Sequence, residues 1–152
     1  MGLDSYLSRK TYVGAMWEHR NVQGTIELPI KGTNIPIDLS KVSEIIEQVG
    51  YWRKANHIHK WFVDNCAHGA DDCREVYVSF EQLKELLALC EAVLSKKVKP
   101  HKKLPTTEGF FFGSDDYDDY YWRTTEYTVE VLKEIIGLGE LSDVDYYYRG
   151  SW

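Results

Sequence analysis

Residues 51–73 read YWRKANHIHKWFVDNCAHGADDC, and no other segment of the 152-residue chain combines aromatic, basic, imidazole and carboxylate groups so densely. The segment holds two of the five Trp, three of the five His and two of the three Cys. Between Trp52 and Cys66 its apolar residues recur at three- and four-residue intervals, which is the spacing of a helix with one apolar face. We therefore expect a helix over 52–66 with a polar and aromatic surface.

A second apolar pattern lies immediately upstream. Four residues follow the spacing of one helical face: Val42, Ile45, Ile46 and Val49. Asp38 or Ser40 is a suitable N-cap for this helix. On a common helical wheel its stripe is displaced by roughly a third of a turn from the stripe of 52–66, and Gly50 at the join costs ~1 kcal/mol inside a helix. The pattern predicts a helix over 41–49, with a kink or break at Gly50.

The remaining sequence alternates β-type and helical runs. Strands are expected at 3–8, 25–30, 34–39, 75–79 and 145–149, and helices at 80–95 and 115–136. Gly32 supplies the turn of a hairpin between 25–30 and 34–39, and Pro29 and Pro36 place both of its strands at an edge or at bulges. Ser79 and Gln82 form a capping box for the helix at 80–95, and Ser114 caps the last helix.

The length and composition of the chain indicate one folded domain. At 152 residues, 43% of them hydrophobic, the chain can form one core and is too short for two. We expect a single α+β domain spanning 1–152. In it, three or four helices pack on a small, mainly antiparallel sheet that is formed by the terminal strands and the hairpin.

The charge and cysteine content exclude several classes of protein. A net charge of −6 disfavours a general nucleic-acid binder, which needs a basic face. No run of 18 apolar residues is present, so no membrane span is expected. An odd number of Cys and no apolar signal region indicate a reducing cytoplasm.

One candidate site lies on the inner face of the predicted 52–66 helix. His59 falls inside the apolar face and Asn56 lies at its margin, with Trp52 on the same side and Arg53 at the rim. A buried polar group left without a partner costs about 1–3 kcal/mol. Either a backbone group or a Tyr hydroxyl satisfies His59 and Asn56, or both line a pocket and bind a ligand.

A second candidate site lies on the outer face, where Trp61 is flanked by Lys54 and His57. An aromatic ring beside cationic side chains can stack a base and contact a phosphate. An exposed Trp also serves as an anchor at protein interfaces. The third interpretation is that the N-terminal loop covers Trp61.

Metal binding and catalysis have weaker support. His57 and His59 point to different sides of the helix, and Cys66-x-His68-x4-Cys73 does not follow zinc-site spacing. No G-x-S-x-G, Walker or H-E-x-x-H motif occurs. We expect no catalytic residue, metal or cofactor. The alternative is a small hydrolase or metal-dependent enzyme that uses His59, Asp72 and Cys73.

The chain resembles a family of small uncharacterised proteins encoded by bacteriophages. The resemblance rests on several segments in matching order and spacing: MGLDSYL, GYWRKANHIHKWFVDN, DDC followed by VSFEQL, LPTTEGFFFGSDDYDDYYW and the final YYYRGSW. The chain departs from the family's usual form at Cys66-Ala67-His68, which further weakens a zinc site. The resemblance implies an accessory protein that works in the cytoplasm of an infected bacterium.

These observations favour binding over chemistry. We expect a phage-type accessory protein, with a role against host defence, that sequesters a nucleotide-like ligand or a host protein. The binding residues would be those of 52–61, with help from the aromatic loop 110–112. No membrane partner is expected, nucleic acid is disfavoured, and self-association stays open.

Overall fold

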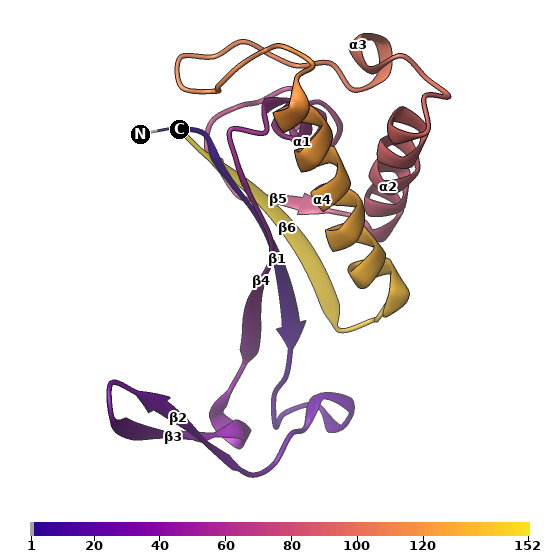
Figure 1. Ribbon diagram of the computed structural model, residues 1–152. Helices are drawn as coiled ribbons and strands as arrows, with labels where there is room; N and C mark the ends of the chain where they lie inside the picture. The colour runs from indigo at the N-terminus through magenta and orange to yellow at the C-terminus, as the bar shows by residue number, and fades with distance from the viewer. Residues whose placement is uncertain (1) are drawn as a thin grey trace.

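The body of the protein is organised on a four-stranded antiparallel sheet with the strand order β4-β1-β6-β5. The computed structural model describes residues 2–152. The strands of the sheet are β1 (Asp4–Tyr12), β4 (Glu44–Arg53), β5 (Val76–Val78) and β6 (Val144–Ser151). The two terminal strands, β1 and β6, pair side by side at the centre, as Figure 1 shows.

Four helices accompany this sheet: α1 (Asn56–Cys66), α2 (Phe80–Leu94), α3 (Pro100–Lys103) and α4 (Asp119–Gly137). The buried side chains of the central strands alternate, with Ser5 and Leu7 on β1 and Tyr146 and Tyr148 on β6. Alternate residues of a strand face the same side. The helices therefore cover one face of the sheet (Figure 1), and the expected α+β architecture is confirmed.

An aromatic cluster joins the sheet to the helices. The ring of Phe62 on α1 stacks on Tyr148 of β6, with centroids 4.0 Å apart and planes within 9°. Trp52 on β4 packs against Phe62 at 6.2 Å, and its indole N–H donates to Thr128 Oγ1 of α4 at 2.9 Å. The cluster thus connects four elements, β4 and α1 from the first half of the chain with α4 and β6 from its last third.

The helix predicted over 41–49 is wrong. Residues 44–53 form β4, which pairs with β1 from Tyr12↔Glu44 to Asp4↔Arg53. Helical spacing and strand alternation are hard to distinguish in a short apolar run. The β-branched residues Ile45, Ile46 and Val49 suit a strand, and pairing with β1 decides the outcome.

Gly50 does not break a helix, since it lies within β4 at an irregularity of the ladder. Leu7 pairs with Gly50 and Ser8 pairs with Gln48, so Val49 is the extra residue of a β-bulge. A Cβ atom at Gly50 would lie 2.6 Å from the ring of Trp52 and 3.3 Å from Leu7 Cβ. The position requires glycine because the Trp52 ring folds over the backbone there.

Most of the other predicted elements are confirmed, with shifted ends. The first strand extends to Tyr12, the capping box of Ser79 and Gln82 begins α2, and the last strand is β6. The last helix begins at Asp119, because the carboxylate of Asp118, rather than Ser114, caps it by accepting from two backbone N–H groups. The connection between α2 and α4, for which no element was predicted, contains the short helix α3.

The predicted hairpin forms but does not join the main sheet. β2 (Thr25–Ile30) pairs with β3 (Thr33–Asp38) in a separate two-stranded sheet. It belongs to the segment 13–43 between β1 and β4, here called the arm, which also contains the short 3-10 helices Glu18–Arg20 and Leu39–Lys41. Figure 1 shows the arm projecting from the end of the body opposite the chain termini.

A search of residues 2–152 finds no helix with both the length and the hydropathy needed to cross a membrane.

Replacement of Gly50 by Ala tests the packing of Trp52. The added Cβ overlaps the indole ring, so we expect a loss of about 1–3 kcal/mol in the free energy of unfolding. Urea denaturation followed by Trp fluorescence measures it. Gly14→Ala is the control, because nothing lies within 4 Å of a Cβ there. Equal denaturation midpoints for the two variants would contradict the packing described.

Candidate functional site

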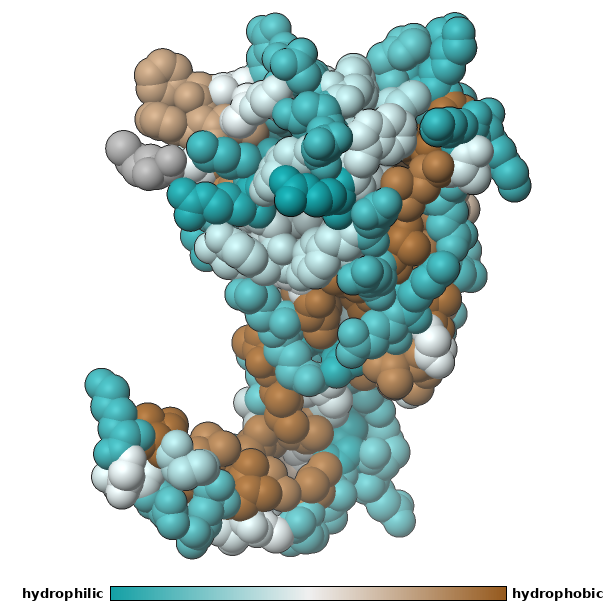
Figure 2. Space-filling view, viewed as in Figure 1, coloured by the Kyte–Doolittle hydropathy of each residue, from teal (hydrophilic) through white to brown (hydrophobic). Residues whose placement is uncertain are grey.

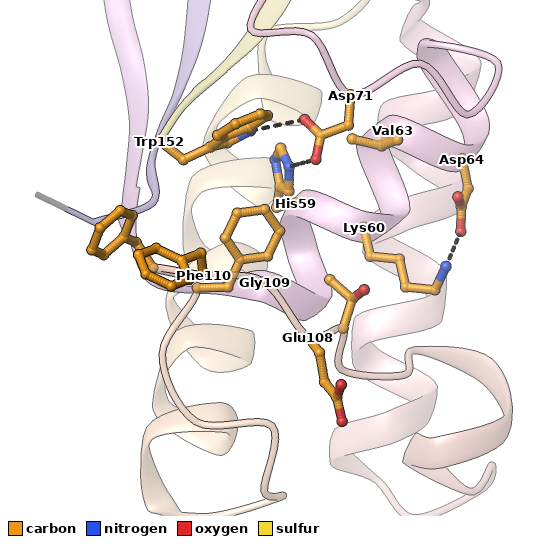
Figure 3. A pocket seen from close by; sticks show the side chains of 12 residues that line it. His59, Lys60, Val63, Asp64, Asp71, Glu108, Gly109, Phe110 and Trp152 are labelled. Carbon is orange, nitrogen blue, oxygen red and sulfur yellow. Dashed lines mark hydrogen bonds and ion pairs between the residues drawn. The ribbon is translucent and has the colours of Figure 1, made fainter.

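A pocket of about 450 Å³ opens beside His59 (Figure 3). One wall is α1, which contributes His59, Lys60, Val63 and Asp64. The other walls are Asp71 of the loop after α1, residues 107–112 of the loop between α3 and α4, and Trp152 after β6. The pocket therefore forms where three segments distant in sequence meet.

Helical spacing places two pairs of residues of α1 along this wall. His59 and Val63 are four residues apart, as are Lys60 and Asp64, so each pair lies on one side of the helix. The Lys60 ammonium donates to Asp64 Oδ2 at 2.7 Å, and both side chains are partly exposed. The cation at the rim of the pocket thus already has an anionic partner.

His59 is the centre of a hydrogen-bonded chain of four side chains. Its Nδ1 lies 2.7 Å from the Tyr148 hydroxyl, and its Nε2 lies 3.0 Å from Asp71 Oδ2. Asp71 Oδ1 accepts from the Trp152 indole N–H at 3.0 Å. Figure 3 shows the two contacts of Asp71. The chain holds the Asp71 carboxylate in a fixed position at the pocket wall.

The direction of these hydrogen bonds follows from Asp71. A carboxylate only accepts, so His59 Nε2 carries a proton and donates it to Asp71. Burial raises the pKa of the Tyr148 phenol, so this hydroxyl keeps its proton and can donate it to His59 Nδ1. Both ring nitrogens are occupied, and neither is free to take a proton from a substrate.

The backbone of β6 fixes the His59 ring from the other side. A Cβ atom at Gly150 would lie 2.6 Å from His59 Cε1 and 2.9 Å from Nδ1. Only glycine allows the strand to approach the imidazole this closely. His59 is therefore positioned by Gly150 and Tyr148 of β6 together.

An aromatic loop forms the opposite wall. Phe110 is 92% exposed, and Phe111 packs edge-on against it with centroids 4.6 Å apart. Phe112 turns inward and packs edge-on against His59 at 5.3 Å and Trp152 at 6.2 Å. The loop thus has one exposed ring, Phe110, one half-buried ring, Phe111, and one buried ring, Phe112.

Asn56 holds this loop in place. Its side-chain N–H2 donates to the carbonyls of Phe112 at 3.2 Å and Ser114 at 2.8 Å, and its Oδ1 accepts from Thr107 N–H at 3.2 Å. Asn56 is buried. Of the two alternatives predicted for Asn56, the structure shows the first: backbone groups satisfy its side chain. Asn56 therefore acts on the pocket only by holding the loop that lines it.

Of the inner set, His59 alone lines the pocket. Trp52 is buried in the core, and Arg53 is exposed at the end of β4, where its carbonyl accepts from the Tyr120 hydroxyl. Neither belongs to α1, because that helix begins at Asn56. The polar partners of His59 are Tyr148 and Asp71.

The outer set is not brought together on one open surface. Trp61 is 8% exposed and packs edge-on against Phe62, so its ring offers no free face for stacking. Lys54 is exposed and lies before α1 with φ 55°. The outward direction predicted for His57 is wrong: it is buried, with its ring 4.1 Å from that of Tyr121 and its Nε2 3.0 Å from Thr125 Oγ1.

The catalytic alternative grouped His59 with Asp72 and Cys73, and the structure pairs His59 with Asp71. Asp72 bonds to Arg74 at 2.6 Å, and this hydrogen bond holds the pKa of Asp72 below its usual value. Burial raises the pKa of Cys66 to about 12, which keeps its thiol protonated. Within residues 2–152 no group of three or more His, Cys, Asp or Glu side chains could hold a metal ion.

Several pocket residues escaped prediction from the sequence. The aromatic loop was identified by its Phe run, but Asp71 and Trp152 carry no local signal. Asp71 reaches the pocket because the loop after α1 returns toward that helix. Trp152 reaches it because β6 ends beside α1. The catalytic alternative named Asp72 of the DDC segment, which is one residue from Asp71.

No protein-family model, curated protein or solved structure matches this chain. The pocket and the chemistry of its walls are therefore the basis for inferring a function.

The burial of His57 predicts a specific pH dependence. Burial lowers the pKa of His57 from 6.5 to about 3, with a small opposing effect of Asp118. The unfolded chain therefore binds the extra proton first, and stability is present above pH 6.5 and lost as the pH falls from 6.5 toward 3. Between about pH 7.5 and about pH 5.5 this group should cost ~1.4 kcal/mol.

Urea denaturation at both pH values measures this loss. The variant His57→Gln should lose less stability over the same interval, because the remaining acids titrate in both proteins. His101→Gln, at an exposed position, should behave like the unsubstituted chain. Identical pH profiles for all three proteins would show that His57 is not the group responsible.

Proposed function

We propose that this chain is a non-catalytic binding protein whose ligand site is the pocket beside His59. One observation carries the proposal: the exposed ring of Phe110 and the half-buried ring of Phe111 line a cavity of about 450 Å³ together with a carboxylate that is fixed by His59 and Trp152. Ligand sites typically combine a largely apolar wall with a few fixed polar groups, at volumes of roughly 300–1,000 Å³. The pocket has both properties.

The hydrogen bonds of His59 support binding of a ligand rather than catalysis. A general base needs a free nitrogen within reach of the proton it takes, and both nitrogens of His59 have protein partners. Asp71 also uses both of its oxygens within the protein. These groups are suited to orienting a ligand.

The pocket walls favour a ligand with a flat ring and N–H donors. Phe110 and Phe111 can stack on a ring, and Asp71 can accept from an amino or imino group. The charged residues of the lining are three acids and one base: Asp64, Asp71, Glu108 and Lys60. Within the nucleotide-like class, this balance favours a nucleoside or monophosphate over a polyphosphate, because the one basic residue, Lys60, already pairs with Asp64.

A host protein is the second candidate ligand. The observation in its favour is Phe110, which is exposed at the mouth of the pocket beside Phe111. Exposed aromatic residues commonly anchor protein interfaces. In the setting that the resemblance to phage proteins implies, either ligand would be sequestered against host defence.

Isothermal titration against nucleosides, monophosphates, cyclic nucleotides and triphosphates tests the proposal. We expect binding of a nucleoside or monophosphate, and a roughly tenfold or greater loss of affinity in Phe110→Ala, because stacking on an aromatic ring contributes ~1–3 kcal/mol. Asp71→Asn should also weaken binding, since the carboxylate is the stronger acceptor.

The matched control is Tyr77→Ala, which removes an exposed ring on β5 that does not line this pocket. It should leave the affinity unchanged. Absence of binding to every compound would end the nucleotide version of the proposal. Binding that survives Phe110→Ala and Asp71→Asn would place the site elsewhere.

A further inference from the structure

The hairpin of the arm has one face that is aliphatic except for Thr33, which pairs with Ile30 beside the turn. Its register pairs Ile26 with Ile37 and Leu28 with Ile35. Because alternate residues point to the same side, these four side chains and Ile30 share one face. The opposite face is mainly polar or proline: Thr25, Glu27, Pro29, Asn34, Pro36 and Asp38. The hairpin is thus amphipathic.

The aliphatic face is open to solvent. Its residues Ile26, Leu28, Ile30 and Ile35 are between 40% and 48% exposed. All residues of β2, and all but Ile37 of β3, are classed as exposed. In Figure 2 hydrophobic surface runs along the arm and continues upward on the side of β4. A lone two-stranded hairpin is marginally stable in water. We therefore expect another apolar surface to pack on this face.

Pro29 and Pro36 restrict how a partner can bind to the hairpin. Proline lacks an N–H, so within a ladder its nitrogen must face away from the paired strand. The pairs Glu27↔Pro36 and Pro29↔Asn34 are two residues apart, so both are of the same type in the ladder. It is the type whose backbone N–H and C=O groups point away from the paired strand. Each outer edge of the hairpin thus lacks a central donor, which disfavours the addition of another strand. The occupant must pack on the face.

We propose that the occupant is a second copy of this chain, with two hairpins packed face to face around a two-fold axis. Sheets that pack in this way lie about 10 Å apart and interdigitate their inner side chains. The result is a small four-stranded sandwich of Ile and Leu. A two-fold dimer is the commonest symmetric assembly and places the same patch on both sides.

The charge of the hairpin segment supports self-association. Between residues 25 and 41, Glu27 and Asp38 are balanced by Lys31 and Lys41, although the whole chain carries −6. The acidic excess that would repel a second copy therefore lies outside this segment. The face itself has no charged group, and its one polar side chain is Thr33 beside the turn.

The exposed area fits a weak dimer. The four most exposed residues of the face, Ile26, Leu28, Ile30 and Ile35, are between 40% and 48% exposed. They leave roughly 300 Å² of aliphatic surface per copy, so two copies would bury roughly 600 Å² of it, which is in the range of weak and transient contacts. We infer a dimer that forms at high protein concentration.

Sedimentation velocity and light scattering over a wide concentration range test this inference. We expect a monomer–dimer equilibrium for the unsubstituted chain. Leu28→Lys combined with Ile35→Lys places charges at the centre of the face and should give a monomer at all concentrations. Thr25→Lys combined with Asn34→Lys adds the same charge to the opposite face, near Asp38 and Glu27, and should dimerise normally.

A milder variant guards against loss of the hairpin itself. Leu28→Ala combined with Ile35→Ala removes apolar area without adding charge and should weaken dimerisation at least tenfold. The unfolding midpoint of the body, followed by the fluorescence of its buried Trp residues, should be the same in every variant. A monomeric unsubstituted chain at the highest concentration, or a dimer that persists in the lysine variant of the aliphatic face, would overturn the inference.

The inference is independent of the proposed function. The pocket is formed by α1, the loop 107–112 and the chain end, and Figure 1 places these at the end of the molecule opposite the arm. Variants of the arm should therefore leave ligand affinity unchanged.

Discussion

The contact of Tyr148 with α1 is the interaction on which the rest of the structure depends. One residue of the central strand β6 stacks its ring on Phe62 and uses its hydroxyl to bind His59. The stack joins the sheet to the helix through apolar burial, and the hydroxyl fixes the imidazole of a buried histidine. Core packing and pocket geometry are therefore consequences of the same side chain.

This coupling explains why the pocket is formed before any ligand binds. His59 is held by β6, Asp71 is held by His59 and Trp152, and the aromatic loop is held by Asn56. None of these contacts involves a group that must move to complete the pocket. A preorganised site loses little entropy on binding, which is consistent with the proposed sequestration of a ligand.

The arm and the body differ in where their apolar side chains lie. The body buries its apolar residues within one chain, through the packing of α1, α2 and α4 on one face of the sheet. The hairpin displays an aliphatic face that its own chain leaves exposed. The proposed ligand site and the proposed interface between copies therefore lie at opposite ends of the molecule and rely on different residues.

Elements whose signals are local were predictable. The hairpin, the capping box at Ser79 and Gln82, the helix that follows it and the last strand all depend on neighbouring residues in the sequence. Within the site, the burial of His59 and the aromatic character of the loop 110–112 were also visible in the pattern, as was the need of Asn56 for partners.

By itself the sequence determined the α+β class, these local elements and the apolar side on which His59 lies. Only the tertiary structure decided that residues 44–53 pair with β1 as a strand, that His57 is buried against Tyr121, and that His59 bonds to Asp71 and Tyr148. The physical reason is the distance along the chain. A strand partner about 40 residues away and a hydroxyl 89 residues away leave no trace in local spacing, and their contacts override the weak local preferences of a short apolar run.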